Sequence, residues 1–360
     1  MGTTMTASNR LLVAGSAVAL LLAGCATGDV SVTSGVVAID RSVVKSRPVE
    51  LPGGYDVDTF DRLRMMVADG EIQSNSQALK NQREYMNIRF QSEMAKHRRF
   101  DFNAVHGLNA ANATLDTLKD QGQVEEDDED DSPLYGKSPA LLLGWTINIQ
   151  QKTEADGKYA QTFKWYCTVN VTVSCRKTVK GSDGKVKYNK GDIAFTRDFD
   201  LPVITKEQTL SSTGAVKSGF SYKSDSDVQS LMQEIVIAAS QRIADDLGRQ
   251  FPVGGKIVGA LGDDLMMMDK GSDDGVEKDM EMVVFARYEG VDVPLANASA
   301  SPSPKKTQLE VWRLADSKYA KTILAEIGGN PKKWAKDTGN ELFAVRVVPP
   351  EDAKHGTRFE

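Results

Sequence analysis

The first residue in this chain that could carry chemistry is Cys25. It follows an apolar run over residues 11–22 and the small pair Ala23-Gly24, and the one charge ahead of the run is Arg10. A charged segment, an apolar segment and a small-residue cleavage site in this order are typical of a secretory signal. The run holds about 12 residues, whereas a membrane-spanning helix needs roughly 20. We therefore predict cleavage between Gly24 and Cys25, which leaves the thiol at the new N-terminus.

The sequence Leu22-Ala23-Gly24-Cys25 resembles the lipobox of bacterial lipoproteins. The resemblance implies that the Cys25 thiol receives a diacylglycerol, with acyl chains of the palmitate type. Ala26, directly after the cysteine, resembles the lipoproteins that are sorted to the outer membrane. The expected location is thus the outer membrane, lipid-anchored and facing the periplasm. An ordinary signal peptide with a chance cysteine is the alternative.

Cys167 and Cys175 have a different setting from Cys25. They lie in a strictly alternating segment, residues 165–175, on the same apolar side as Trp165 and Val169. The interval between the two cysteines spans roughly 26 Å of strand, whereas a disulfide needs Cα atoms within about 7 Å. We therefore predict two buried thiols without a bridge.

Residue patterns for catalysis, metals or cofactors are missing. His97, His106 and His355 show no ligand spacing, and the acidic run at residues 125–131 lacks the turn glycine of a calcium loop, which favours a solvated loop. The sequence contains no Gly-x-Ser-x-Gly elbow, phosphate-binding loop, dinucleotide fingerprint or His-Glu-x-x-His motif. With a net charge of −6 and no basic stretch, nucleic acid is not an expected partner. The sequence predicts no enzyme, no cofactor and no metal site.

The elements around these residues predict an antiparallel sheet covered by helices. Of the 360 residues, 40% are hydrophobic and 26% charged, which is ordinary for a chain that buries cores. Apolar alternation predicts strands at residues 60–68, 99–105, 139–150, 159–175 and 192–201, the last with Ile193 in phase with Phe199. Helical periodicity predicts helices at residues 81–97, 108–118 and 226–247. The last helix is expected to end at Gly248, with Asp245 and Asp246 on its polar side.

Residues 251–360 have a different sequence pattern, with short apolar segments separated by residues typical of tight turns. Strands are predicted at residues 256–261, 265–269, 280–288, 308–315, 320–327 and 342–348. A turn is expected at residues 271–275 and an exposed loop at residues 296–306, which contain Ser-Pro-Ser-Pro. A small barrel or sandwich would close these strands.

The predicted fold class is α+β. It is a three-layer-like α/β sandwich, with a mostly antiparallel sheet packed by helices, followed by a small all-β barrel. The predicted organisation is a lipoprotein signal peptide at residues 1–24, a flexible tether at 25–58, an α/β domain at 59–250 and a β-rich domain at 251–360.

Three stretches carry a family resemblance. They are Leu-Arg-Met-Met-Val-Ala-Asp at residues 63–69, Glu-Met-Ala-Lys at 93–96 ahead of Arg99-Phe100, and Ala-Leu-Leu-Leu-Gly-Trp-Thr-Ile at 140–147. With the order of elements, they resemble the CsgG-like family, named for the curli assembly and transport lipoprotein and similar in fold to the LpoB-like activators. Residues 255–276 resemble the small β-domain of the FlgT-like flagellar proteins.

The resemblance implies a non-catalytic outer-membrane lipoprotein that acts by docking a periplasmic or outer-membrane protein, as an assembly, transport or activator component. The alternative is a subunit of an oligomeric secretion pore of the curli type, and a homo-oligomer stays open. The resemblance to the pore-forming member of this family implies two long membrane hairpins per subunit, and a membrane-spanning strand needs about 9–11 residues. The connection at residues 150–159 is short and charged, and residues 202–223 alternate poorly, so docking is the favoured interpretation.

Overall fold

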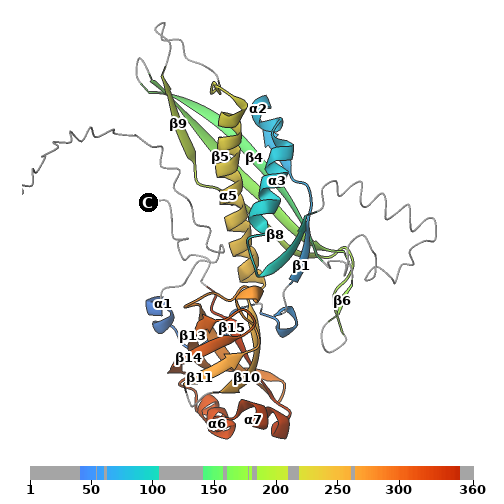
Figure 1. The fold of residues 1–360 in the computed structure, drawn as a ribbon, viewed down its shortest axis with the longest axis vertical. Coiled ribbons are helices and arrows are strands. Elements are labelled where there is room, and N and C mark those ends of the chain that lie inside the picture. Colours follow the sequence, from blue (N-terminus) through green and yellow to red (C-terminus); the bar gives the residue numbers. More distant parts are fainter. Residues whose placement is uncertain are drawn as a thin grey trace, which may run out of the picture. The chain divides into compact units, whose positions relative to one another are not determined.

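The computed structural model describes residues 41–53, 55–60, 63–104, 141–156, 160–176, 178–180, 185–209, 219–260 and 264–348. All of them belong to the compact unit Thr33–Glu360. They form a helix-packed mixed sheet and a closed six-stranded antiparallel barrel, each with its own apolar core (Figure 1). The α+β class with a small barrel is thereby confirmed.

The sheet has the strand order β3-β1-β4-β5-β8, with β2 also paired to β4 and β9 also paired to β5. Its strands are β1 Leu63–Val67, β2 Glu71–Ser74, β3 Phe100–Ala104, β4 Leu141–Asp156, β5 Ala160–Cys175, β8 Ile193–Asp200 and β9 Ile204–Thr209. The pairs among β4, β5, β8 and β9 are antiparallel, while β1 pairs in parallel with β3 and β4, and β2 with β4. A short hairpin, β6 Val179–Lys180 with β7 Val186–Tyr188, stands apart.

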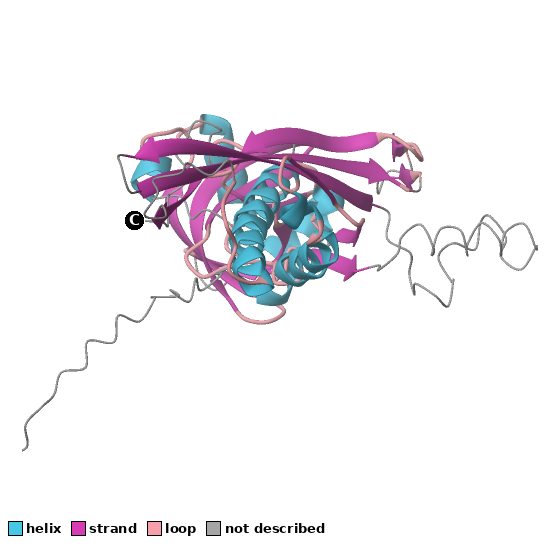
Figure 2. Ribbon diagram, turned by 90° about the horizontal axis from the view of Figure 1, so that it is seen from above, coloured by secondary structure: helices cyan, strands magenta, loops and turns pink. Residues whose placement is uncertain are grey.

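Helices α3 (Arg83–Met94) and α5 (Asp225–Gln250) lie on one face of this sheet, with the short α2 (Gln77–Lys80) beside them (Figure 2). The alternating residues of β4 and β5 point toward them and are buried, as are Cys167 and Cys175. The apolar stripe of α5 is buried against the same core, as its 3.6-residue period predicted. Phe90 of α3 stacks on Trp145 of β4 at 3.8 Å between ring centroids.

The end of α5 differs from the prediction. The helix does not stop at Gly248 but continues to Gln250, and Asp245 and Asp246 are buried. A Cβ at Gly248 would lie 3.3 Å from Nη1 of Arg346, so the missing side chain leaves room for a buried arginine. The expected polar side of this last turn is an internal ion-pair site, in which Arg249 bonds to Asp245 and Arg242 to Asp246.

The outward face of the sheet is polar along β5 and β8. Thr168 donates to Asp200 at 2.7 Å, and Asn170 donates to Asp198 one step along the ladder. The predicted phase of β8 is wrong at its first residue. A register shift between Val173 and Ser174 turns Ile193 outward, where it is 63% exposed.

The barrel closes in the order β10-β11-β14-β13-β12-β15, with every pair antiparallel. Its strands are β10 Gly254–Ala260, β11 Leu265–Met268, β12 Glu281–Tyr288, β13 Val291–Pro302, β14 Thr307–Leu314 and β15 Glu341–Arg346. Helices α6 (Lys318–Ile327) and α7 (Pro331–Thr338) pack on the barrel and on each other. The turn predicted at residues 271–275 is present as a 3-10 turn at Ser272–Asp274.

Two predictions for this region are wrong. Residues 320–327 form helix α6, not a strand, because Ser317 caps the first turn and Ala320, Ile323 and Ile327 share one buried face. Residues 296–302 are not an exposed loop but part of β13. Small side chains there are buried in the barrel at Ala296, Ala298 and Ala300.

None of the helices within the described ranges has the length and apolarity needed to cross a membrane.

Candidate functional site

A segment of residues 41–60, here called the strap, packs along the barrel. It begins with α1 (Arg41–Lys45), includes a 3-10 turn at Val57–Thr59 and ends at Phe60. Val49 and Phe60 belong to the barrel core, and Leu51, Tyr55 and Val57 pack against it. The sequence predicted a flexible tether up to residue 58. The described part of that interval, from residue 41 on, is instead bound to the barrel.

The first strap contact is made by α1 on strands β12 and β14. Arg41 Nε donates to Oε1 of Glu281 at 2.7 Å, and Trp312 Nε1 donates to Oε2 of the same carboxylate at 2.8 Å. The Arg41 guanidinium lies 5.3 Å from the Trp312 ring centroid, within cation–π range. The Glu281 side chain is only 4% exposed, so this pairing supplies a buried carboxylate with two donors.

A second contact fixes the end of α1. Arg313 Nη1 donates to the carbonyl oxygens of Val44, Lys45 and Arg47, at 3.4, 3.2 and 2.6 Å. The last carbonyls of a helix have no partners within it and carry partial negative charge, so a cation there stabilises the end of the helix. A helix of this length is marginal alone, and Arg313 ties it to β14.

The third contact is a polar triad at the other end of the strap. The hydroxyl of Tyr55 donates to Oδ2 of Asp292 at 2.6 Å, and Arg287 forms two bonds to the same carboxylate at 2.9 and 3.0 Å. Burial, the hydrogen bond to Asp292 and the charge of that carboxylate all raise the pKa of Tyr55. Burial alone would raise the pKa of Asp292, but the bonds from Arg287 and Tyr55 outweigh it and the pKa is lowered.

Phe60 completes the strap inside the barrel core. Its ring lies 6.5 Å from Phe285 and 6.2 Å from Phe343, edge-on to both. A Cβ at Gly254 of β10 would lie 2.6 Å from Cε1 of Phe60, so the glycine is what admits the ring. Just before it, Asp56 and Asp58 both pair with Lys187 of β7.

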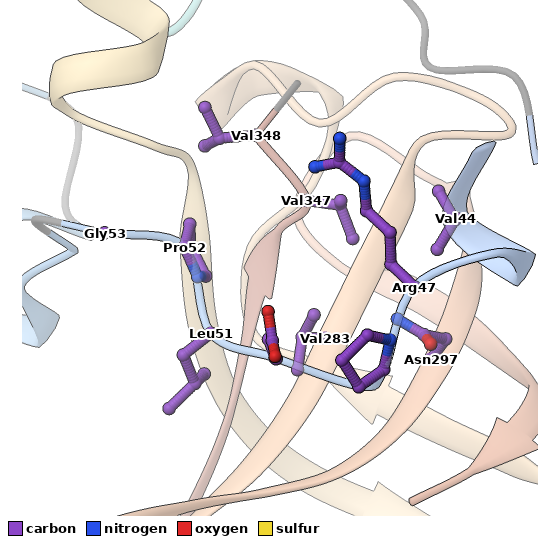
Figure 3. Close-up of a pocket in the computed structure, with 11 residues that line it drawn as sticks. Val44, Arg47, Leu51, Pro52, Gly53, Val283, Asn297, Val347 and Val348 are labelled. Atoms are coloured by element: carbon purple, nitrogen blue, oxygen red, sulfur yellow. The ribbon is translucent and has the colours of Figure 1, made fainter. Parts of the chain in front are cut away.

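A small cavity lies between the strap and the barrel, with a volume of about 210 Å³ (Figure 3). Strap residues line one side and barrel residues the other: Val44, Arg47, Pro48, Glu50, Leu51, Pro52 and Gly53 from the strap, and Val283, Asn297, Val347 and Val348 from the barrel side. Asn297 is 2% exposed and its Oδ1 has no hydrogen-bond partner in the described structure. The volume is below the range usual for small-molecule sites, and a few water molecules would fill it.

No family model matches this sequence, and no curated protein matches it. Three solved structures show a partial likeness. A hypothetical protein of Chlamydia trachomatis is 13% identical, with coverage of 53% of this chain and 97% of that one and a TM-score of 0.27. A homologue of the neuraminyllactose-binding hemagglutinin from Helicobacter pylori is 10% identical, with coverage of 56% and 91% and a TM-score of 0.23. A lipoprotein of Neisseria meningitidis is 12% identical, with coverage of 51% and 99% and a TM-score of 0.20. No function follows from values this low.

The described residues include two buried titratable groups, Cys167 and His97, whose pKa values are shifted. Within those ranges no group of three His, Cys, Asp or Glu side chains could hold a metal ion. Burial raises the pKa of Cys167 to about 12, and burial lowers the pKa of His97 to about 4. The buried thiol is therefore protonated and the buried imidazole neutral at neutral pH. The strap contacts are hydrogen bonds, ion pairs and apolar packing.

The sequence-predicted site residues Gly24 and Cys25 lie outside the described residues, as do the acidic run at 125–131 and the helix predicted at 108–118. The strap was missed by sequence reasoning. Its prolines and glycines are typical of a linker, and its contacts are with residues far along the chain, such as Lys187, Glu281 and Asp292. The available signal was the set of apolar residues in this stretch, among them Val49, Leu51, Tyr55 and Phe60.

Proposed function

We propose that this chain is a non-catalytic lipoprotein, anchored in the outer membrane through Cys25, that faces the periplasm and docks a partner protein. Within that class we propose the role that the CsgG-like resemblance implies, an assembly, transport or activator component. The domain limits stay part of this proposal, with the signal peptide at residues 1–24 and the tether shortened to residues 25–40.

The observation that carries the proposal is the attachment of the strap to the barrel. Because Arg41 and Arg313 fix α1 to the barrel, the tether in this proposal ends before residue 41 and not at residue 58. About 16 residues separate Cys25 from Arg41, which span at most roughly 53–58 Å when fully extended. A lipid on Cys25 would therefore hold the barrel within that distance of the membrane. One acyl chain binds a bilayer only marginally, so more than one is required for a stable anchor.

The partner-docking surface in this proposal is the outward face of the sheet. Helices α3 and α5 cover the other face, while the row formed by Thr168, Asn170 and Asp198 is exposed. Polar side chains already held in register by cross-strand hydrogen bonds offer a pre-organised surface, which lowers the entropic cost of binding.

The test is Cys25→Ser, compared with the neighbouring substitution Thr27→Ser, which keeps the thiol. After a wash at about 1 M salt, which removes proteins held to the membrane only by charge, we expect Cys25→Ser to move the protein from the membrane to the soluble fraction and to remove the mass of the acyl groups from the intact protein. Thr27→Ser should leave both unchanged. A Cys25→Ser protein that stays in the membrane fraction with an unchanged mass would refute the lipid anchor.

The size of the protein in detergent distinguishes the docking lipoprotein from the alternative, a secretion-pore subunit. The ends of β4 and β5 carry Lys152, Glu154 and Lys164 on the outward side, with Lys164 bonded to Glu154 at 2.7 Å. A strand end of this kind does not supply a lipid-facing apolar band. Sizing of detergent-extracted protein should give a monomer or small oligomer, and a stable ring of many subunits would favour the pore.

A further inference from the structure

Helices α6 and α7 carry a concentration of positive charge on an otherwise acidic chain. Their lysines are Lys318, Lys321, Lys332, Lys333 and Lys336, and all five are exposed. The acidic side chains of the same two helices are Glu326 and Asp337, while the whole chain has a net charge of −6. None of the five ammonium groups forms an ion pair or hydrogen bond with any part of the chain that the structure describes.

The lysines of each helix share a side. Lys332 and Lys336 are four residues apart, and Lys318 and Lys321 three apart, spacings that place side chains next to each other on a helix surface. The opposite side of each helix is turned toward the barrel, through Ile323 and Trp334. We call the solvent side of α6 and α7, with its five lysines, the lysine face.

Apolar side chains lie exposed beside the lysine face. Tyr319 of α6 is 49% exposed and contacts Tyr288 of β12, with 5.7 Å between ring centroids. Tyr288 also stacks on Trp334 at 6.4 Å, and its cross-strand partner is Val291, which is 62% exposed. Tyr319 thus contacts Tyr288, and Val291 pairs with Tyr288 in the β12–β13 ladder, so the three side chains belong to one partly apolar tip of the barrel, which also carries the exposed Glu289.

We propose that the lysine face and this tip bind the surface of an anionic phospholipid membrane. Lysine side chains can keep the ammonium at the phosphate level while the methylene stem lies on apolar surface. Tyrosine is favoured at the same depth because it combines an apolar ring with a polar hydroxyl. The proposal deepens the proposed function, since it gives the barrel its own contact with the membrane to which Cys25 is tethered.

The composition of the face favours a membrane over a nucleic acid or an acidic protein. All five cations are lysines, which are mobile point charges, whereas the fixed planar fork of arginine suits bidentate recognition of one phosphate or carboxylate. The arginine nearest the tip in sequence, Arg287, is already paired with Asp292. An exposed aliphatic side chain such as Val291 adds affinity for a lipid surface but not for a soluble polyanion.

The expected loss of membrane affinity follows from the number of lysines removed. A basic residue near an anionic membrane contributes about fivefold in affinity, so removing three lysines should weaken binding by about 100-fold. The attraction is screened strongly as the Debye length falls from about 8 Å at 0.15 M salt to about 3 Å at 1 M.

The experiment uses the full chain with Cys25→Ser, so that no acyl chain contributes to binding. Its variant combines Lys332→Gln, Lys333→Gln and Lys336→Gln. The matched control combines Lys80→Gln, Lys190→Gln and Lys223→Gln, three exposed lysines of the sheet region with the same total change in charge. All three proteins keep the same N-terminal 40 residues, so any contribution of that region to membrane binding is the same in each.

Co-sedimentation is measured with vesicles of phosphatidylcholine, alone or with one third phosphatidylglycerol. We expect salt-sensitive binding of the parent and the control that is stronger to the anionic than to the neutral vesicles. The salt-sensitive binding of the α7 variant should be about 100-fold weaker, with unchanged thermal unfolding. Equal binding of variant and control would overturn the proposal. Binding of the parent to DNA or polyglutamate without binding to vesicles would overturn it too. Neither result depends on whether Cys25 is lipidated, which the Cys25→Ser fractionation decides separately.

Discussion

The replacement Phe60→Ala tests whether the strap belongs to the barrel core. The ring is 3% exposed and lies edge-on to Phe285 and Phe343. Its removal deletes buried apolar contacts and leaves a cavity, which costs about 3–5 kcal/mol for phenylalanine in a packed core. The two aromatic pairs contribute stability beyond the burial of apolar area, so we expect a loss of unfolding free energy in the upper part of that range.

Gly254 supplies the second side of a double-mutant cycle. A methyl group there would lie 2.6 Å from Cε1 of Phe60, so Gly254→Ala alone forces the ring and strand β10 apart. Overpacking of this kind costs about 1–3 kcal/mol. In the double variant the ring is absent and the methyl group enters the vacated space. The double variant should therefore lose less stability than the two single losses added together, by at least about 1 kcal/mol.

Urea unfolding of the four proteins measures the cycle, with tryptophan fluorescence as one readout because Trp312 and Trp334 belong to the barrel region. Ile193→Ala, at an exposed position of the sheet, is the control and should change the free energy of unfolding by less than about 0.5 kcal/mol. Two outcomes would refute the reasoning. One is a loss below about 1 kcal/mol for Phe60→Ala, and the other is strict additivity of the two single losses.

Two further predictions concern buried titratable groups. Burial lowers the pKa of His97 to about 4, so the unfolded chain binds a proton that the folded chain does not between that value and about 6.5. Stability should fall by up to about 3 kcal/mol as the pH is lowered through this window, and urea unfolding of His97→Gln should show a flatter pH dependence. Burial also raises the pKa of both Cys167 and Cys175. In a Cys25→Ser chain, alkylation at neutral pH should proceed only as fast as unfolding, and rapid labelling of the native protein would contradict their burial.

The parts of the fold that sequence could predict are those with a long, uniform period. Strand β5 alternates from Phe163 to Cys175, and α5 keeps one apolar stripe from Val228 to Leu247. In both cases one face meets the core along its whole length, so each residue repeats the same signal. The local breaks in period were missed. The register shift at Val173 exposes Ile193, and nothing in the alternation of β8 marks it.

Short elements in the barrel were harder to predict, because over a few residues the strand period and the helix period fit the same apolar positions. Residues 320–327 contain apolar residues at spacings that fit either a strand or a helix, and the deciding signals are the Ser317 cap and the left-handed Gly328, with φ 55°. Strand β13 was hidden by its composition. Alanine and serine are not among the residues that favour strands. They are buried here because a small barrel needs small side chains at some interior positions.

The candidate site was beyond sequence reasoning for a different reason. The strap has no helical or strand period, and its position depends on single long-range pairs such as Arg41 with Glu281 and Tyr55 with Asp292. No local pattern encodes such a pair. The lysines of α7 were visible in the sequence, but the strand prediction for its neighbour α6 concealed that both helices present them on one side.

The last turn of α5 shows how one mistaken boundary can hide a connection between parts of the chain. Glycine often follows the last residue of a helix, yet α5 continues through Gly248. Arg346, at the end of β15, occupies the space that a side chain at this position would fill. Burial lowers the pKa of Arg346 to about 10, against the opposing charges of Asp245 and Glu277, so the guanidinium stays charged at neutral pH. A buried charge is tolerated only with a partner, and Asp245 provides one. Asp245, which the sequence placed on a solvated side of the helix, therefore lies inside as a partner for Arg346, where α5 meets the final strand of the barrel.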